Sequence, residues 1–381
     1  MNQPEWDAVR MRIAALGRTP DAADIADALR WCGHVVSDES VLAVAEALRR
    51  DSVGAGPLEP LLALPGVTDV LVNGPADVYV DTGDGLRRVA VRFGSDEDVR
   101  RLAVRLAASV GRRLDDASPF VDARMADGTR VHAVLGSIAD VGTCLSLRIP
   151  ARQRLSLDDW VASGTCHPEA ATVLRRMVSA NVAFLVSGGT GSGKTTLLGS
   201  MLSLVPPDQR ILVVEDSREL DPGHPHCVRL EGRVANAEGA GSVSMTQLVR
   251  QALRMRPDRI VVGEVRGPEL VDLLIALNTG HEGGCGTVHA NTADTVPARL
   301  EALAALGGLG REAAHSQIAA AVRAVVHVSR EGGRRRVAEV AVITRGSDGL
   351  VSTTPALRVS ADARLALGPG LDALEAVLEA R

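Results

Sequence analysis

A glycine-rich stretch at residues 188–195 constrains this chain more than any other feature of its sequence. It reads Gly-Gly-Thr-Gly-Ser-Gly-Lys-Thr, which fits the pattern G-x-x-x-x-G-K-[ST] at every fixed position. The apolar run at 182–187 has the length and β-branched content of a buried strand, and 194–204 has the pattern of a helix. A strand, a glycine-rich turn and a helix in this order predict a phosphate-binding loop within an α/β fold.

The residue types of this loop suit the binding of a nucleoside triphosphate. Glycines allow backbone N–H groups to wrap a polyphosphate in conformations that a Cβ would obstruct. The N-terminus of the following helix adds unpaired N–H groups and a positive dipole end. Lys194, expected as a surface cation, can reach the β- and γ-phosphates, and the Thr195 hydroxyl can ligate Mg²⁺. The alternative is a glycine-rich turn with a chance lysine. The residues expected to bind the nucleotide here are Gly188, Gly189, Thr190, Gly191, Ser192, Gly193, Lys194, Thr195 and Thr196.

Carboxylates follow two further predicted strands, and ligands bind at the carboxyl edge of an open parallel sheet. Glu215 and Glu219 follow the strand predicted at 211–215, where they can orient a water or take its proton for attack on the γ-phosphate. The alternative is a solvated acidic turn. Glu264 ends an apolar run in the manner of a Walker B strand, which predicts a position near Mg²⁺ and its bound water. An ion pair of Glu264 with Arg266 is the alternative.

Two histidines form a third group. His281 and His289 lie within nine residues of each other around a strand predicted at 284–288. A neutral histidine near a γ-phosphate can sense it by hydrogen bonding, whereas a lone histidine is more often structural. We expect His281 to contact the nucleotide and His289 to take part in catalysis.

Composition narrows the classes of protein that this chain can be. Its 381 residues suggest two or three domains, and 46% apolar with 23% charged residues is typical of a globular protein. Three Phe, three Trp, one Tyr and a net charge of −5 predict no stable nucleic-acid binding. No secretory signal or membrane span is visible. Five cysteines without C-x-x-C pairing indicate a cytosolic protein with reduced thiols and no zinc site.

Changes of pattern along the chain predict its domains. The first 54 residues follow helical periods, the next segment mixes short strands with one helix, and a polar stretch without a period then reads as a linker. Beyond it helices and strands alternate, which predicts a mostly parallel sheet. The predicted division is a helical module at 1–54, an α+β domain with one sheet at 55–150, a linker at 151–164, an α/β ATPase domain at 165–345 and a tail at 346–381.

Individual elements follow from periodicity and capping signals. Asp21 and Ser37 are expected N-caps, Ser244 and Gln247 an expected capping box, and Pro168 an expected first helical residue. The predicted helices are 5–16, 21–32, 39–50, 96–111, 168–179, 194–204, 244–255 and 268–278. The predicted strands are 67–74, 77–81, 87–92, 130–135, 143–148, 182–187, 211–215, 260–265 and 284–288.

Taken together, these motifs resemble the type II/IV secretion ATPases, and most closely the tight-adherence (Tad/Cpa) pilus-assembly branch with its conjugal-transfer-associated members. Four boxes occur in the family's order, at 188–195, 215–219, 254–266 and 287–291. The N-terminal signatures of the branch are matched at 56–62, 67–75 and 118–131. The resemblance runs from about 55 to 345. The four-cysteine zinc insert of some type II enzymes is absent, which favours the pilus or conjugation branches.

The resemblance implies a homohexameric ring that holds ATP between an N-terminal PAS-like domain and a RecA-like P-loop motor. In the family, arginines of the first domain approach the nucleotide, and the matching positions are Arg124 and Arg130. The catalytic glutamate maps to Glu219, with Glu215 supporting it. The implied function is a cytosolic ATPase, peripheral to the inner membrane, that powers pilus assembly or secretion through a platform protein. Alternatives are a type IV secretion or conjugation traffic ATPase, and a nucleotide-gated scaffold with little turnover.

Overall fold

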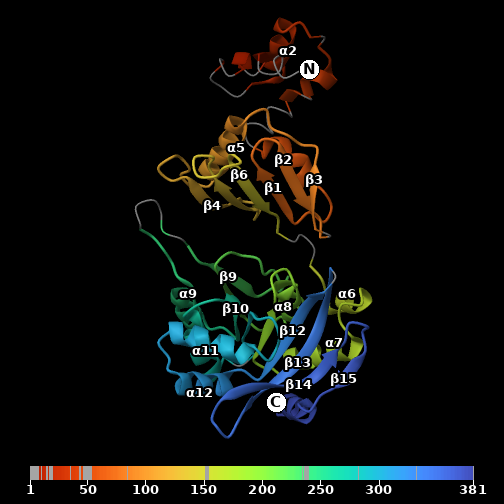
Figure 1. Cartoon of the computed structure of the whole chain (residues 1–381), viewed down its shortest axis with the longest axis vertical. Coiled ribbons are helices and arrows are strands. Elements are labelled where there is room, and N and C mark those ends of the chain that lie inside the picture. Colours follow the sequence, from red (N-terminus) through yellow and green to blue (C-terminus); the bar gives the residue numbers. More distant parts are fainter. Residues whose placement is uncertain are drawn as a thin grey trace. The chain divides into compact units, whose positions relative to one another are not determined.

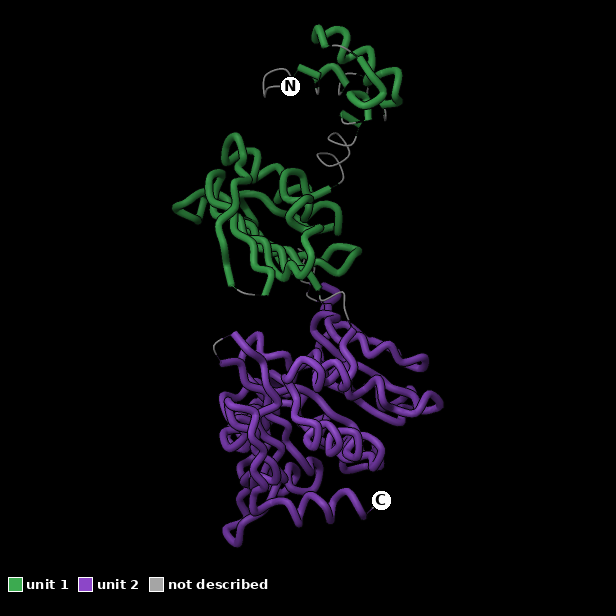
Figure 2. The backbone as a smooth tube through the Cα atoms, turned by 90° about the vertical axis from the view of Figure 1, so that its right-hand side faces the viewer, with its two compact units in different colours: residues 1–150 green, residues 151–381 purple. Residues whose placement is uncertain are grey.

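Figure 1 shows the chain as a computed structural model, which describes residues 54–380 except 84, 151–153, 234, 236–239, 282 and 332. Of the preceding part it describes 8–9, 11–13, 16, 20–34, 36–42 and 44–45. The chain divides into two units, Met1–Pro150 and Ala151–Arg381 (Figure 2), each with its own hydrophobic core. None of the helices in this described part is long and apolar enough to cross a membrane.

Helix α2 (Ala22–Trp31) begins the well-described part of the N-terminal module. Its N-cap is Asp21, as predicted, and a capping box joins the side chains and backbone N–H groups of Asp21 and Asp24. The Ser37 Oγ accepts the N–H of Ser40 at 3.1 Å, which fits its expected capping role. Much of the helices predicted at 5–16 and 39–50 lies outside the described residues, and the described parts are helical except for Leu16, which lies in a turn.

Six antiparallel strands form the sheet of the first unit, in the order β3-β2-β1-β6-β5-β4. Helix α5 (Asp96–Ser109) packs Val99, Leu102 and Leu106 against the alternate buried residues of these strands, as a strand period of two requires. The expected α+β domain with one sheet is present, while its likeness to a PAS domain stays a prediction. The other elements are η1 Gly56–Leu58, α4 Glu59–Leu62, β1 Asp69–Asn73, β2 Asp77–Asp81, β3 Leu86–Val89, β4 Phe120–Arg124, β5 Arg130–Val134 and β6 Cys144–Arg148.

Nine strands form the sheet of the second unit, in the order β15-β14-β13-β12-β7-β11-β10-β8-β9. The six from β12 to β9 are parallel, and β13, β14 and β15 extend them antiparallel. The strand bounds are β7 Phe184–Gly188, β8 Ile211–Glu215, β9 Cys227–Glu231, β10 Arg259–Val265, β11 Cys285–His289, β12 Ala324–Glu331, β13 Arg334–Arg345, β14 Val351–Val359 and β15 Leu365–Leu367.

Helices cover both faces of this sheet and bury two apolar layers (Figure 1). The first layer is made with α6 Leu157–Ala162, α7 Pro168–Ser179, α8 Lys194–Leu202 and α13 Leu371–Glu379. The second is made with α9 Met245–Ala252, α10 Glu269–Asn278, α11 Val296–Leu306 and α12 Arg311–Ala321, and η2 Leu253–Met255 follows α9. The predicted capping box of Ser244 and Gln247 and the predicted Pro168 at the start of α7 are confirmed.

Two segments differ from their expected roles. Residues 157–162, assigned to the linker, form α6, because Leu157 and Trp160 on one side of this single turn and a half are buried in the core of the second unit. Residues 346–381, assigned to a tail, contribute β14, β15 and α13, and so they complete the sheet and its first layer.

Candidate nucleotide-binding site

The glycine-rich loop joins the end of β7 to the start of α8. A Cβ on Gly188 would approach the Val328 carbonyl oxygen and would lie 2.6 Å from the Ser192 Oγ. Gly193, the N-cap of α8, has φ of 99°, a left-handed conformation that favours glycine. The turn therefore places the N-terminus of α8, with its unpaired N–H groups and positive dipole end, at the carboxyl end of β7.

Helix α6 supports this turn. A Cβ on Gly193 would lie 3.2 Å from the Trp160 ring, so the indole packs under the loop. The Trp160 Nε1 donates to the Ser200 Oγ of α8 at 3.0 Å, and Trp160 is 2% exposed. A segment that the sequence predicted to be a linker thus helps to hold the phosphate loop in its conformation.

Lys194 is buried, at 8% exposure. The expectation that it is a surface cation is therefore wrong. Its Nζ donates to the carbonyl oxygens of Gly188 and Gly189 at 3.0 and 2.9 Å. Burial lowers the pKa of the ammonium, an effect that the negative charges of Glu264 and Glu219 oppose and the positive charge of Arg266 reinforces. Lys194 follows β7, Glu264 lies near the end of β10 and Glu219 follows β8, and these parallel strands end at the same edge of the sheet.

The two glutamates of the acidic box have different surroundings. Glu215 is 4% exposed, and its Oε1 accepts the N–H groups of Glu219 and Leu220 at 3.1 and 3.0 Å. Its Oε2 is buried with no hydrogen-bond partner in the described part of the chain. Burial raises the pKa of Glu215 to about 7. Glu215 therefore fixes the turn that carries Glu219. Because Glu219 is exposed, it is the carboxylate of the two that water can reach.

Glu264 lies near the end of β10 and is paired with Arg266, as the alternative interpretation of this motif expected. The charge of Glu264 also opposes the lowering of the Lys194 pKa. The turn after β10 is held by Glu269, whose Oε1 accepts the N–H groups of Arg266 and Gly267 at 2.6 and 2.7 Å. The ion pair with Arg266 is therefore present, and the position of Glu264 near Mg²⁺ stays a prediction.

The two histidines lie at opposite edges of the sheet. His289 ends β11 and is the register partner of Gly188, the first residue of the loop. His281 precedes β11, whose first residue is the register partner of Phe184 at the start of β7. The parallel strands therefore separate His281 from the loop by the length of β11, about 13 Å or more at 3.3 Å per residue. The structure does not bring His281 to the loop of its own chain.

Arg124 and Arg130 belong to the first unit, and their approach to the nucleotide stays a prediction. They are register partners at the ends of β4 and β5, and Arg130 is also the register partner of Arg148 on β6. Directly opposed residues share a face of a sheet, so three arginines form a row. Arg148 was not among the predicted site residues, although the alternation of residues in 143–148 places it on this face.

Other residues of the site lie far from the loop in sequence. On β12, His327 is buried, and its Nδ1 lies 2.9 Å from the Oγ of Ser187 on β7. Burial lowers the pKa of His327, which favours the neutral imidazole. From the β12–β13 hairpin, the Arg335 Nε donates to the Gly191 carbonyl at 3.3 Å. No local motif marks these residues, although the basic run at 334–336 is visible in the sequence.

The residues present fit a nucleoside triphosphate. Glycines stand where a Cβ would fill the loop, and the Ser192 Oγ is buried with no hydrogen-bond partner among the described residues, which suits a phosphate oxygen. Thr195 at the start of α8 and Glu264 on β10 offer the oxygen ligands that Mg²⁺ prefers. The described residues contain no group of three His, Cys, Asp or Glu side chains that could hold a metal ion by themselves.

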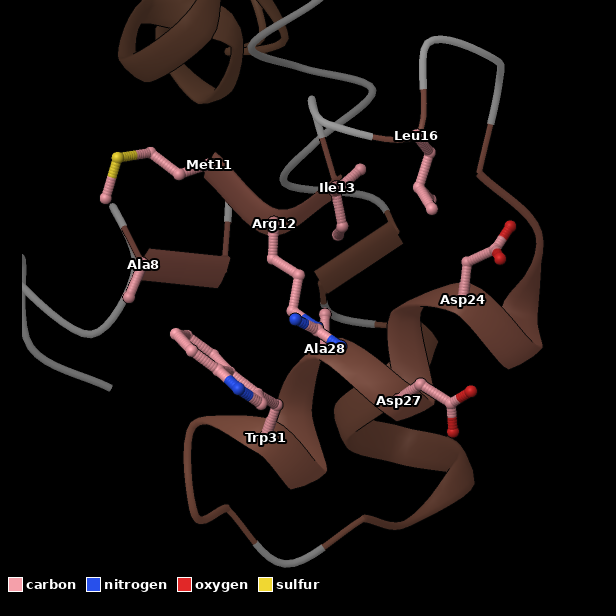
Figure 3. A pocket seen from close by; sticks show the side chains of 9 residues that line it. All are labelled: Ala8, Met11, Arg12, Ile13, Leu16, Asp24, Asp27, Ala28 and Trp31. Atoms are coloured by element: carbon pink, nitrogen blue, oxygen red, sulfur yellow. The ribbon is translucent and has the colours of Figure 1, made fainter.

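A separate cavity of about 510 Å³ opens in the N-terminal helical module (Figure 3). The Arg12 guanidinium lies 5.0 Å from the centre of the Trp31 ring, Asp27 pairs with Arg30, and Asp24 caps α2. Its charged groups thus have partners within the module, and we do not assign it a ligand. Its lining residues are Ala8, Met11, Arg12, Ile13, Leu16, Asp24, Asp27, Ala28 and Trp31.

Comparison with known proteins identifies the class. Residues 51–332 match the family described as "Type II/IV secretion system protein", so this chain belongs to that family and is an NTP-hydrolysing ATPase.

Among its relatives is the "Putative conjugal transfer protein Rv3659c" of Mycobacterium tuberculosis (strain H37Rv), 57% identical over 83% of this chain and 92% of that protein. The "Type IV secretion system protein PtlH" of Bordetella pertussis (strain Tohama I) is 31% identical over 74% of this chain and 92% of that protein. The solved structure of the ATPase DotB from Yersinia pseudotuberculosis matches 82% of this chain and 81% of that chain, with a TM-score of 0.52 at 18% identity. That last match shows the likeness of fold alone.

Proposed function

We propose that this chain is the ATPase of a conjugation-type or type IV secretion system, which hydrolyses ATP on the 188–195 loop to drive transfer of its cargo. The observation that carries the proposal is the phosphate loop with Glu215, Glu219 and Glu264 at the same sheet edge. The names of the relatives, a conjugal transfer protein and a type IV secretion protein, support the system.

The sequence resemblance pointed first to Tad/Cpa pilus assembly and kept conjugation as an alternative. The relatives favour the alternative, so pilus assembly is no longer the main interpretation. The nucleotide-gated scaffold is disfavoured by the intact acidic residues beside the loop. A net charge of −5 and few aromatic residues argue that the chain energises transfer without gripping DNA itself.

The chemistry is assigned to named side chains. The loop N–H groups and Lys194 bind the phosphates, and Glu219 accepts a proton from the attacking water. Glu215 positions Glu219 through the 216–220 turn. Thr195 and Glu264 would hold Mg²⁺, which neutralises charge on the phosphates. His289 lies next to Gly188, where an imidazole can respond to the nucleotide.

The assembly follows from the family resemblance. We propose a homohexamer, located in the cytoplasm and bound to the inner face of the membrane through a platform protein. Its two domains are PAS-like and RecA-like and close on ATP, and this closure brings Arg124 and Arg130 to the γ-phosphate, where such arginines are worth about 10³–10⁵ in rate.

The proposal is tested by replacing Lys194 with Ala at the gene's own locus. DNA transfer and export of secreted proteins are both measured in the host, and surface filaments are counted in parallel. We expect transfer or export to fall to the level of a deletion strain. Loss of filaments with transfer and export unchanged would return the function to pilus assembly, and no defect in any readout would refute a motor role.

A further inference from the structure

The β12–β13 hairpin places two arginines side by side at the phosphate loop. Arg330 on β12 and Arg335 on β13 are directly opposed register partners. Like charges that face each other across a strand pair are destabilising. The neighbouring register pair is Glu331 with Arg334, and Glu331 also forms an ion pair with Arg336 at 3.1 Å.

Both arginines contact the loop. The Arg335 Nε donates to the Gly191 carbonyl, and its Cδ would lie 3.3 Å from a Cβ on Gly193. The Arg330 Nη1 would lie 3.4 Å from a Cβ on Gly191. The absence of side chains at these two glycines therefore gives the guanidinium groups access to the loop backbone.

The surroundings of Arg335 are short of negative charge. Within the described part of the chain the Arg335 side chain has no ion pair, and its one hydrogen bond is the one to the Gly191 carbonyl oxygen. Arg335 is exposed, and its pKa is lowered, first by partial desolvation beside the loop and then by the positive charge of Arg330. A site with two adjacent guanidinium groups and an anion-binding loop is suited to a polyphosphate, because guanidinium binds phosphate oxygens in a bidentate manner.

The hairpin acts on a different part of the site from the catalytic carboxylates. The proposed function assigns the γ-phosphate to the side of Lys194, on which the charges of Glu264, Arg266 and Glu219 act. Arg330 and Arg335 instead adjoin Gly191 and Gly193, near the turn into α8.

We propose that Arg330 and Arg335 form a second cationic wall of the nucleotide site, which binds the α- and β-phosphates. This inference rests on the proposed ATPase function and adds affinity determinants to it. Because the α- and β-phosphates are common to ADP and ATP, the pair contributes equally to the affinity for both and little to the chemical step.

The test compares Arg335→Gln and Arg330→Gln with Arg334→Gln, which makes the same charge change on the same hairpin. The dissociation constants of adenosine, AMP, ADP and a non-hydrolysable ATP analogue are measured by competition against a fluorescent ADP. We expect Arg335→Gln to weaken ADP and the ATP analogue by about tenfold or more and adenosine by less than about twofold. The turnover number should change by less than about threefold while KM rises, and Arg335→Lys should recover part of the affinity.

Two results would overturn the inference. One is that Arg335→Gln and Arg330→Gln have the same four affinities as Arg334→Gln, which would show that the pair does not bind the phosphates. A fall in turnover with unchanged ADP affinity would instead assign the pair to the γ-phosphate. The wild type and Lys194→Ala separate this inference from the proposed function. If the wild type hydrolyses ATP and Lys194→Ala does not, a negative result for the hairpin concerns the hairpin alone.

Discussion

Replacing Glu215 with Gln is expected to change how the stability of the second unit depends on pH. Burial raises the pKa of Glu215 from its usual 4.5 to about 7. Between these two values the folded chain holds a proton that the unfolded chain has released, so the free energy of unfolding falls as the pH rises. At about 1.4 kcal/mol for each pH unit, the fall reaches roughly 3 kcal/mol by neutral pH and then levels off. Glutamine does not titrate, so the variant should lack this part of the pH dependence.

The assay is urea unfolding followed by the fluorescence of Trp160, which lies in the core beside the loop. Trp6 and Trp31 are replaced by Phe so that Trp160 is the only tryptophan. Glu219→Gln is the matched control, because it removes a carboxylate four residues away that is exposed. Parallel curves of unfolding free energy against pH for the wild type and Glu215→Gln, between about pH 4.5 and 8, would show that Glu215 does not titrate in this window.

Three further predictions concern activity. Glu219→Gln should keep ATP binding and lower hydrolysis by about 10²-fold or more; normal hydrolysis, with Glu215→Gln inactive, would exchange the roles of the two glutamates. His289→Ala should lower steady-state turnover while His281→Ala leaves it near the wild-type rate, since only His289 lies beside the loop; equal effects would contradict this placement. The Arg124→Ala, Arg130→Ala double variant should lose about 10³-fold in hydrolysis with much less effect on ADP affinity, and full activity would refute closure onto these arginines.

Local pattern was enough to predict the centre of the second unit. The strands β7, β8 and β10 contain buried apolar runs, and the predicted 211–215 and 168–179 match β8 and α7 to the residue. Parallel strands place their carboxyl ends at one edge, so the position of Glu215 and Glu264 near the loop followed from the sequence.

His281 shows that closeness in sequence to His289 does not predict a shared site. His289 is eight positions further along the chain, but the last five of these positions, His289 included, form β11, which crosses the whole sheet. A strand of this length carries its two ends to opposite edges, so neighbouring histidines do not share a site. The direction of each strand, and not the spacing of the histidines, decides which one lies beside the loop.

The hairpin and α6 were missed for different reasons. Arg335 contacts Gly191 across 144 residues of sequence, and only the pairing of β12 with β7 brings them together. Helix α6 has six residues, too few for a helical period to emerge, and burial of Trp160 under the loop is a tertiary contact. Such contacts override local pattern.

The central claim is that ATP is hydrolysed on the 188–195 loop. Its most direct test is steady-state phosphate release from Mg·ATP by the full-length chain and by Lys194→Ala, with Trp160 fluorescence as the check on folding. The account predicts turnover by the wild type and a loss of at least about 100-fold in Lys194→Ala. Wild-type turnover by a folded Lys194→Ala chain would contradict it.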